Sequence, residues 1–262
     1  MSEPKPGATF VLIHGAWQGA WAWLRVVPLL EAHGHSAIAV DLPGNGHDDT
    51  PPGDVTTMVY ASHVAAIIDA IAGPVIVVGH SMGGTVAAQV SELRPERIGA
   101  AIYLCAFLLP DGDSILDFYG RAWDDTMTGA HTRVTYSDDG FLSTIDPDSA
   151  KAVFYAQANP RDAAEAAKQL TPQPEGGRRS KLKLSERNFG RVPRIYIETT
   201  RDASVFIELQ RRMHTETPCA HVFALDTDHA PQLSAPQALA EILCNVAGLY
   251  DLAGTQSSIR PD

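Results

Sequence analysis

The sequence predicts an α/β fold with a mostly parallel central sheet and helices on both faces. Short apolar runs of strand length alternate with longer stretches of helical periodicity, which is typical of a parallel sheet covered on both sides. In addition, the apolar run at 75–78 leads directly into Gly79-His-Ser-Met-Gly83 and then into a small-residue helical stretch. A strand therefore passes through one tight turn into a helix, as such folds require.

The elements of the core follow in order along the chain. The expected strands are apolar runs bounded by turn residues, and they cover 9–13, 37–40, 74–78, 98–104, 192–198 and 221–225. The expected helices have an apolar face with capping or breaking residues at their ends, and they cover 17–33, 56–72, 82–93, 204–214 and 236–247.

This alternation stops after Pro110 and resumes near residue 192. Residues 111–190 contain several prolines and glycines, few strand-like runs, and helical stretches at 149–158 and 160–170. We therefore expect an inserted, mainly helical cap at 111–190, a core made of 1–110 and 191–248, and a polar tail at 249–262. A basic cluster in this cap is expected to be a solvated loop, and it consists of Arg178, Arg179, Lys181 and Lys183.

Composition narrows the class of protein. The chain has 262 residues, 45% of them hydrophobic, and a formal net charge of −11, which disfavours nucleic acid or an anionic membrane as a partner. Its three cysteines are too few for a disulfide framework, and Cys105 and Cys244 are expected to be core thiols. The sequence has neither a secretory h-region nor an apolar run long enough to span a membrane, so we expect a cytoplasmic protein.

Ser81 is the candidate nucleophile. In Gly-x-Ser-x-Gly the glycines allow a turn that is too tight for side chains beside the serine, and the turn exposes the hydroxyl above the sheet edge. The helix that begins at about Met82 directs its amide dipoles toward the same place, which favours negative charge there.

A serine hydroxyl needs a base, and the base needs a group that orients it. Asp202, which follows the strand at 192–198, is the expected acid. Asp226 and Asp228 are rival candidates, but they lie too close to the histidine in sequence to approach its far ring nitrogen easily. His229, which follows the strand at 221–225, is the expected base, whereas His80 in the elbow is expected to point away from it.

Two backbone amides are expected to bind the developing oxyanion. They belong to Met82, directly after the serine, and to Ala16, in the loop after the first strand. Apolar side chains at the seam between cap and core are candidates for substrate contact, although they could equally be ordinary cap core: Phe107, Leu108, Phe118, Trp123 and Phe154. His and Cys show no ligand spacing, so no metal or organic cofactor is expected.

Taken together, these residues resemble the α/β-hydrolase superfamily. The branch that holds plant hydroxynitrile lyases, methyl esterases and related bacterial carboxylesterases is the most similar, through His14-Gly-Ala-Trp17 above all. Further similar stretches are 10–23, 28–35, 79–84, 109–112 and 228–231. The resemblance covers the core and not the cap. It implies a carboxylesterase-type serine hydrolase that cleaves esters of small, apolar or aromatic substrates through an acyl-enzyme, and a homodimer as one oligomeric state.

Two departures from the lyase members favour the esterase. The lyases carry a threonine where this chain has Gly15 and a lysine where it has Ala230, and neither residue here offers a side-chain hydrogen bond. A hydroxynitrile lyase is therefore the weaker hypothesis. The same serine, acid and histidine also fit a cofactor-free haloperoxidase or perhydrolase, and the fold alone fits a hydrolase-like binding protein with little turnover.

Overall fold

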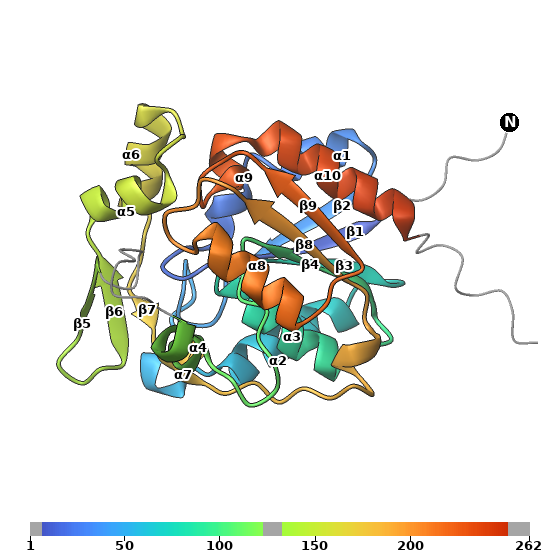
Figure 1. Ribbon diagram of the computed structural model, residues 1–262, viewed down its shortest axis with the longest axis horizontal. Helices are drawn as coiled ribbons and strands as arrows, with labels where there is room; N and C mark the ends of the chain where they lie inside the picture. The colour runs from blue at the N-terminus through green and yellow to red at the C-terminus, as the bar shows by residue number, and fades with distance from the viewer. Residues whose placement is uncertain (1–6, 123–132, 251–262) are drawn as a thin grey trace, which may run out of the picture.

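A computed structural model describes residues 7–122 and 133–250 of the chain (Figure 1). Six parallel strands form its main sheet, in the order β2-β1-β3-β4-β8-β9. They are β1 (Thr9–Ile13), β2 (Ser36–Val40), β3 (Val75–His80), β4 (Ile98–Leu104), β8 (Arg194–Thr199) and β9 (His221–Leu225). Each lies where the sequence predicted a strand, so the predicted fold class is confirmed.

Helices cover both faces of this sheet, as Figure 1 shows. On one face lie α1 (Val27–Ala32) and α10 (Pro236–Leu249), and on the other α2 (Thr57–Asp69), α3 (Gly83–Leu93) and α8 (Ile207–Glu216). Successive residues of a strand point to opposite faces. Thus Phe10 packs on the α10 side, while Val11 packs on the α2 and α3 side.

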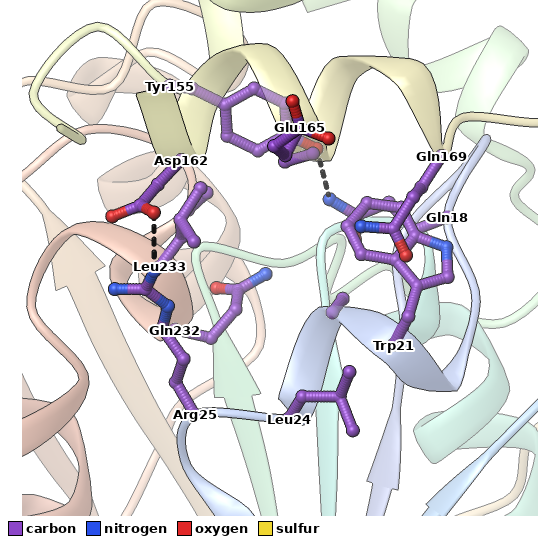
Figure 2. Close-up of a pocket in the computed structure, with 13 residues that line it drawn as sticks. Gln18, Trp21, Leu24, Arg25, Tyr155, Asp162, Glu165, Gln169, Gln232 and Leu233 are labelled. Carbon is purple, nitrogen blue, oxygen red and sulfur yellow. Dashed lines mark hydrogen bonds and ion pairs between the residues drawn. The ribbon is translucent and has the colours of Figure 1, made fainter. Parts of the chain in front are cut away.

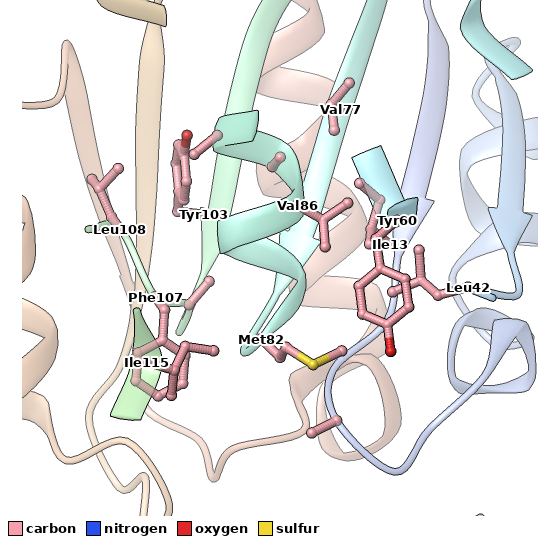
Figure 3. Packing of buried hydrophobic residues seen from close by; sticks show 14 of the residues in the cluster. Ile13, Leu42, Tyr60, Val77, Met82, Val86, Tyr103, Phe107, Leu108 and Ile115 are labelled. Carbon is pink, nitrogen blue, oxygen red and sulfur yellow. The ribbon is translucent and has the colours of Figure 1, made fainter. Parts of the chain in front are cut away.

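The apolar packing on the α2 and α3 side of the sheet extends as far as the candidate site (Figure 3). Side chains of the inner strands, such as Val77, pack against Val86 of α3 and Tyr60 of α2. Met82 and Phe107 lie at the end of the same cluster, directly next to the turn that follows β3. The turn is therefore anchored in buried apolar packing.

The single helix predicted over 17–33 is wrong. The structure has a short 3₁₀ turn, η1 (Ala20–Trp23), and then α1, whose first turn contains Pro28. Trp17 has a φ of 63°, in the left-handed region that no right-handed helix accommodates. Proline lacks an N–H and suits the first turn of a helix, so a new helix begins there instead of continuing.

The stretch between β4 and β8 contains helices and an unexpected second sheet. The helices are α4 (Ile115–Ala122), α5 (Pro147–Phe154), α6 (Pro160–Lys168) and α7 (Gly176–Arg179). An antiparallel sheet joins β5 (Val134–Tyr136), β6 (Leu142–Ile145) and β7 (Gln173–Pro174). These strands have two to four residues, too few for their alternation to stand out in the sequence.

In Figure 1 this small sheet and the helices α5 and α6 lie together at one side of the main sheet. Three further short elements complete the described chain: η2 (Pro52–Asp54), η4 (Phe189–Arg191) and α9 (Pro231–Ser234). Within the described ranges, no helix combines the length and the apolar content needed to cross a bilayer. The expected tail lies almost entirely outside the described residues.

Candidate active site

Ser81 lies in the turn between β3 and α3, with a φ of 52°. A serine rarely adopts this left-handed conformation, so the surroundings must hold it. The Ser81 amide donates to Leu104 O (3.2 Å), and its carbonyl accepts from Phe107 N (3.0 Å). A Cβ at Gly79 would lie 2.4 Å from Gly83 O, so the turn closes only with glycine there.

His229 follows β9, and its ring meets Asp202, which follows β8. His229 Nδ1 lies 2.7 Å from Asp202 Oδ2, and both side chains are buried. The rival carboxylates face elsewhere: Asp226 pairs with Arg201 at the surface, and Asp228 accepts from the amide of Gln157. The acid that contacts the histidine is thus the one expected from the order of the strands.

The protein holds the Asp202 carboxylate through both of its oxygens. Oδ1 accepts from the amides of Ser204 (2.7 Å) and Val205 (2.8 Å). Oδ2 accepts from Thr199 Oγ1 (2.9 Å) and Gln210 Nε2 (3.2 Å) as well as facing His229. Buried carboxylates require such partners, and here the partners also set the direction of the carboxylate toward the imidazole. The helix α8 begins at Ile207 and not at the predicted Ser204.

The expectation that His80 points away from the base is wrong. Its Nε2–H donates to the backbone carbonyl of His229 (2.8 Å), and the two ring centroids lie 4.8 Å apart. Burial lowers the pKa of His80 well below its usual value, so the ring stays neutral. His80 therefore ties the residue before Ser81 to the loop that carries His229.

Three atoms that could bind a metal ion lie within 4.8 Å of one another, one each from His80, Cys105 and His229. These groups are already occupied by hydrogen bonds. His80 and the Cys105 thiol both donate to His229 O, and His229 Nδ1 faces Asp202. Burial also raises the pKa of Cys105, which disfavours the thiolate that a metal needs. The cluster fits a brace for the His229 loop better than a metal site.

Ser81, Ala16 and Met82 line one cavity. Ala16 lies in the loop after β1, and Met82 caps α3. In the part of the chain that the structure describes, neither amide donates to a protein acceptor. The arrangement therefore leaves two backbone donors available beside the serine, as an oxyanion hole requires.

The remaining wall of this cavity differs from the one expected. Of the predicted contact residues only Phe107 lines it, whereas Leu108 and Phe118 are packed in the core. Phe154 stacks between Trp17 and His229, outside the cavity lining, and Trp123 lies outside the described residues. The lining residues that sequence reasoning missed are Trp17, Ile115, Tyr119, Arg178 and Ser204.

Among residues 111–190, Arg178 departs most from its expected position. The expected basic loop is solvated at Arg179, Lys181 and Lys183, but the Arg178 side chain is only 3% exposed. It pairs with Glu175, which is fully buried, and lies over the ring of Trp17. No feature of the local sequence distinguishes Arg178 from its basic neighbours, since its burial depends on packing against distant residues.

A larger cavity of about 140 Å³ opens between η1, α6 and α9 (Figure 2). Gln18 and Gln232 line it, and both also contact Nδ1 of His80. An ion pair between Arg25 and Asp162 (2.7 Å) lies at its edge. Ser81 does not line this cavity, so we do not expect bond cleavage in it.

Comparison with known proteins places this geometry in a family. The model of the "Alpha/beta hydrolase family" matches residues 10–242, which is most of the chain. The chain therefore belongs to the α/β hydrolase family, and its resemblance to the methylesterase branch is confirmed by the relatives.

Methylesterase 1 of Arabidopsis thaliana is 34% identical over 265 residues, which cover 95% of this chain and 100% of the relative. Putative methylesterase 15, chloroplastic, of the same plant is 34% identical over 92% of this chain. The chain spans only 56% of that relative's length. Among solved structures, a pyrethroid hydrolase from Sphingobium faniae JZ-2 matches with a TM-score of 0.82 and 28% identity, covering 92% of this chain and 97% of its own.

The expected cytoplasmic location stays a prediction.

Proposed function

We propose that this protein is a carboxylesterase-type serine hydrolase that cleaves small carboxylic esters through an acyl-enzyme. The observation that carries the proposal is the buried contact between Asp202 and His229, 2.7 Å long, beside an elbow that carries Ser81. Relatives named as methylesterases support the same reaction class. Residues 111–190 act in this proposal as a cap over the core.

In the proposed mechanism, His229 takes the proton of Ser81 as the hydroxyl attacks the ester carbonyl. Because Nδ1 of His229 faces Asp202, Nε2 is the nitrogen that accepts this proton. The amides of Ala16 and Met82 bind the oxyanion. His229 then protonates the departing alcohol and activates water to release the acid. Each step uses only groups of this chain, the ester and water.

The lyase hypothesis is disfavoured at Gly15. A Cβ at this position would lie 2.9 Å from His80 Nδ1 and 3.0 Å from Ser81 Cβ. The threonine of the lyases would therefore displace the serine or the histidine beside it. Ala230 likewise supplies no cation for a leaving cyanide. Cleavage of a cyanohydrin, or formation of a peracid from acetate and peroxide, would identify the lyase or the perhydrolase instead.

The test is hydrolysis of methyl esters that vary in acyl length and aromaticity, with Ser81→Ala run in parallel. We expect Ser81→Ala to lose at least about a thousandfold in kcat, as for removal of a nucleophile. Ser91→Ala is a matched control, because Ser91 is also buried, lies in the adjoining α3, and bonds only Ala87 O. A Ser81→Ala protein that keeps most of the wild-type rate would refute the mechanism, and one that still binds ligand and functions normally would favour a binding protein.

A further inference from the structure

Arg178 brings a charged donor into the wall of the cavity that holds Ser81. Its side chain is 3% exposed and lines this cavity together with Ser81, Ala16 and Met82. A guanidinium has five N–H donors. Among the residues that the structure describes, the Arg178 guanidinium makes a single hydrogen bond, from Nη1 to Glu175 Oε1 (2.7 Å). Most of its donors therefore have no acceptor within the described chain.

The fold holds this side chain between Trp17 and Glu175. Its guanidinium carbon lies 5.1 Å from the centre of the Trp17 ring, and Trp17 directly follows the oxyanion residue Ala16. Trp17 Nε1 donates to Ser143 (3.1 Å to Oγ), whose hydroxyl in turn donates to Glu175 Oε1 (2.6 Å). The cation is thus fixed over the oxyanion loop and is not free to leave for solvent.

The backbone below Arg178 is docked just as closely. Thr57 of α2 donates its hydroxyl to Gly177 O (3.0 Å), and a Cβ at Gly177 would lie 2.3 Å from the Tyr60 ring. Glycine at 177 therefore lets α7 approach α2 closely enough for the next side chain to reach the cavity. A solvated surface arginine would need no such approach.

We infer that Arg178 is a specificity-determining residue that binds a second, uncharged acceptor oxygen on the acyl part of the substrate, such as a ketone or hydroxyl. This inference rests on the proposed ester hydrolysis and names the class of ester within it. A guanidinium with unfilled donors stabilises any oxygen acceptor that reaches it, since hydrogen bonds to charged groups are among the stronger ones.

The charges around the cavity favour a substrate with an uncharged oxygen over one with a carboxylate. Glu175 already neutralises Arg178, and Asp202 adds another buried carboxylate beside the cavity, next to the lining residue Ser204. Since the proposed general base His229 must be neutral to accept a proton, Glu175, Arg178 and Asp202 together leave a net negative charge around the cavity. An anionic substrate would be repelled by that charge, whereas a ketone keeps the hydrogen bond without the repulsion.

The test compares matched methyl esters. Methyl acetoacetate and methyl levulinate carry a ketone at different distances from the ester, and methyl butanoate and methyl pentanoate are their plain counterparts. Monomethyl succinate supplies the carboxylate. We expect wild type to prefer at least one keto ester, and Arg178→Met to reduce the ratio of kcat/KM on the keto ester to kcat/KM on its plain counterpart about 10- to 100-fold, through KM.

Arg179→Met is the matched control, because Arg179 is the next residue and also pairs with Glu175, at the longer distance of 3.9 Å, but is about half exposed and lies over Tyr136 and not in the cavity wall. The double variant Glu175→Gln with Arg178→Met removes both buried charges, so it supplies a folded protein if the single variant fails to fold. It is expected to lose the same preference.

The outcomes separate the two proposals. Equal loss on keto and plain esters would mean that Arg178 only braces the cap, and would overturn the inference while leaving the hydrolase intact. A preference for monomethyl succinate over methyl levulinate would overturn the choice of an uncharged oxygen. Absence of hydrolysis of every ester by wild type would refute the proposed function itself.

Discussion

Two buried carboxylates in this protein each face a basic side chain at 2.7 Å, and they are held in different ways. Asp202, at the end of a core strand, accepts four hydrogen bonds besides its contact with His229. Glu175, between β7 and α7, uses Oε1 for Arg178 and Ser143, while its Oε2 has no hydrogen-bond partner among the described residues. Both carboxylate oxygens of Asp202 therefore have hydrogen-bond partners, whereas one carboxylate oxygen of Glu175 does not.

This difference indicates different tasks. A saturated carboxylate cannot reorient, so it fixes one tautomer and one ring position of the histidine that contacts it. An unsaturated pair keeps donors and an acceptor available for another molecule, at a cost in stability. The comparison therefore predicts that changes at Asp202 act mainly on the rate, whereas changes at Arg178 act on stability and on the choice of ester.

The largest effect is expected for Asp202→Asn. The amide keeps the shape of the carboxylate but favours the wrong tautomer of His229, so kcat on the best ester should fall about 10⁴-fold. Asp226→Asn is the matched control, since Asp226 pairs with Arg201 at the surface. A loss of only about tenfold or less for Asp202→Asn would remove the contrast between the two pairs.

The next effect is on stability. Arg178→Met leaves the buried Glu175 with only its longer ion pair to the half-exposed Arg179 (Oε2 to Nε, 3.9 Å), which should lower the free energy of unfolding by about 3–5 kcal/mol, measured with urea. Adding Glu175→Gln should recover most of this loss, because no uncompensated charge remains. If the double variant is no more stable than the single one, the two side chains do not act as a charged pair.

The smallest expected effect is a pH dependence of stability that comes from the buried His14. Burial lowers the pKa of His14 to about 4, and its two nitrogens meet Gly15 O (2.8 Å) and the amide of Leu42 (3.1 Å) as a neutral ring. The unfolded chain binds this proton near pH 6.5, so stability is full above that pH and falls as the pH drops toward 4. The total loss is about 3 kcal/mol.

Urea unfolding between pH 6.5 and about pH 5 measures this slope before most carboxylates titrate. His14→Gln should reduce this slope and leave the part that comes from His80, whose pKa is also lowered by burial. An equal slope in this variant would assign the pH dependence to different groups.

Much of the core was predictable because it repeats simple local rules. Strands of five to seven mostly apolar residues, bounded by turns, form the main sheet, and parallel strands bring their carboxyl ends to one edge. That rule was enough to expect Asp202 beside His229, although they are 27 positions apart. It failed for His80, because the direction of a buried ring depends on which carbonyl lies opposite it.

The stretch between β4 and β8 was less predictable, and Arg178 shows why. In the sequence it stands between a glycine and another arginine and looks like its solvated neighbours. Its burial needs the ring of Trp17, 161 positions earlier, and a carboxylate three residues before it. Likewise Phe107 faces the cavity while Leu108 beside it faces the core.

The order of the elements along the chain thus predicted the layers of the fold and pointed to a candidate serine, acid and histidine, because strand periodicity and turn chemistry are local properties. The wall of the cavity, the brace formed by His80 and the buried arginine came from contacts between residues far apart in sequence. Such contacts depend on how closely whole elements pack, and no short stretch of sequence encodes that distance.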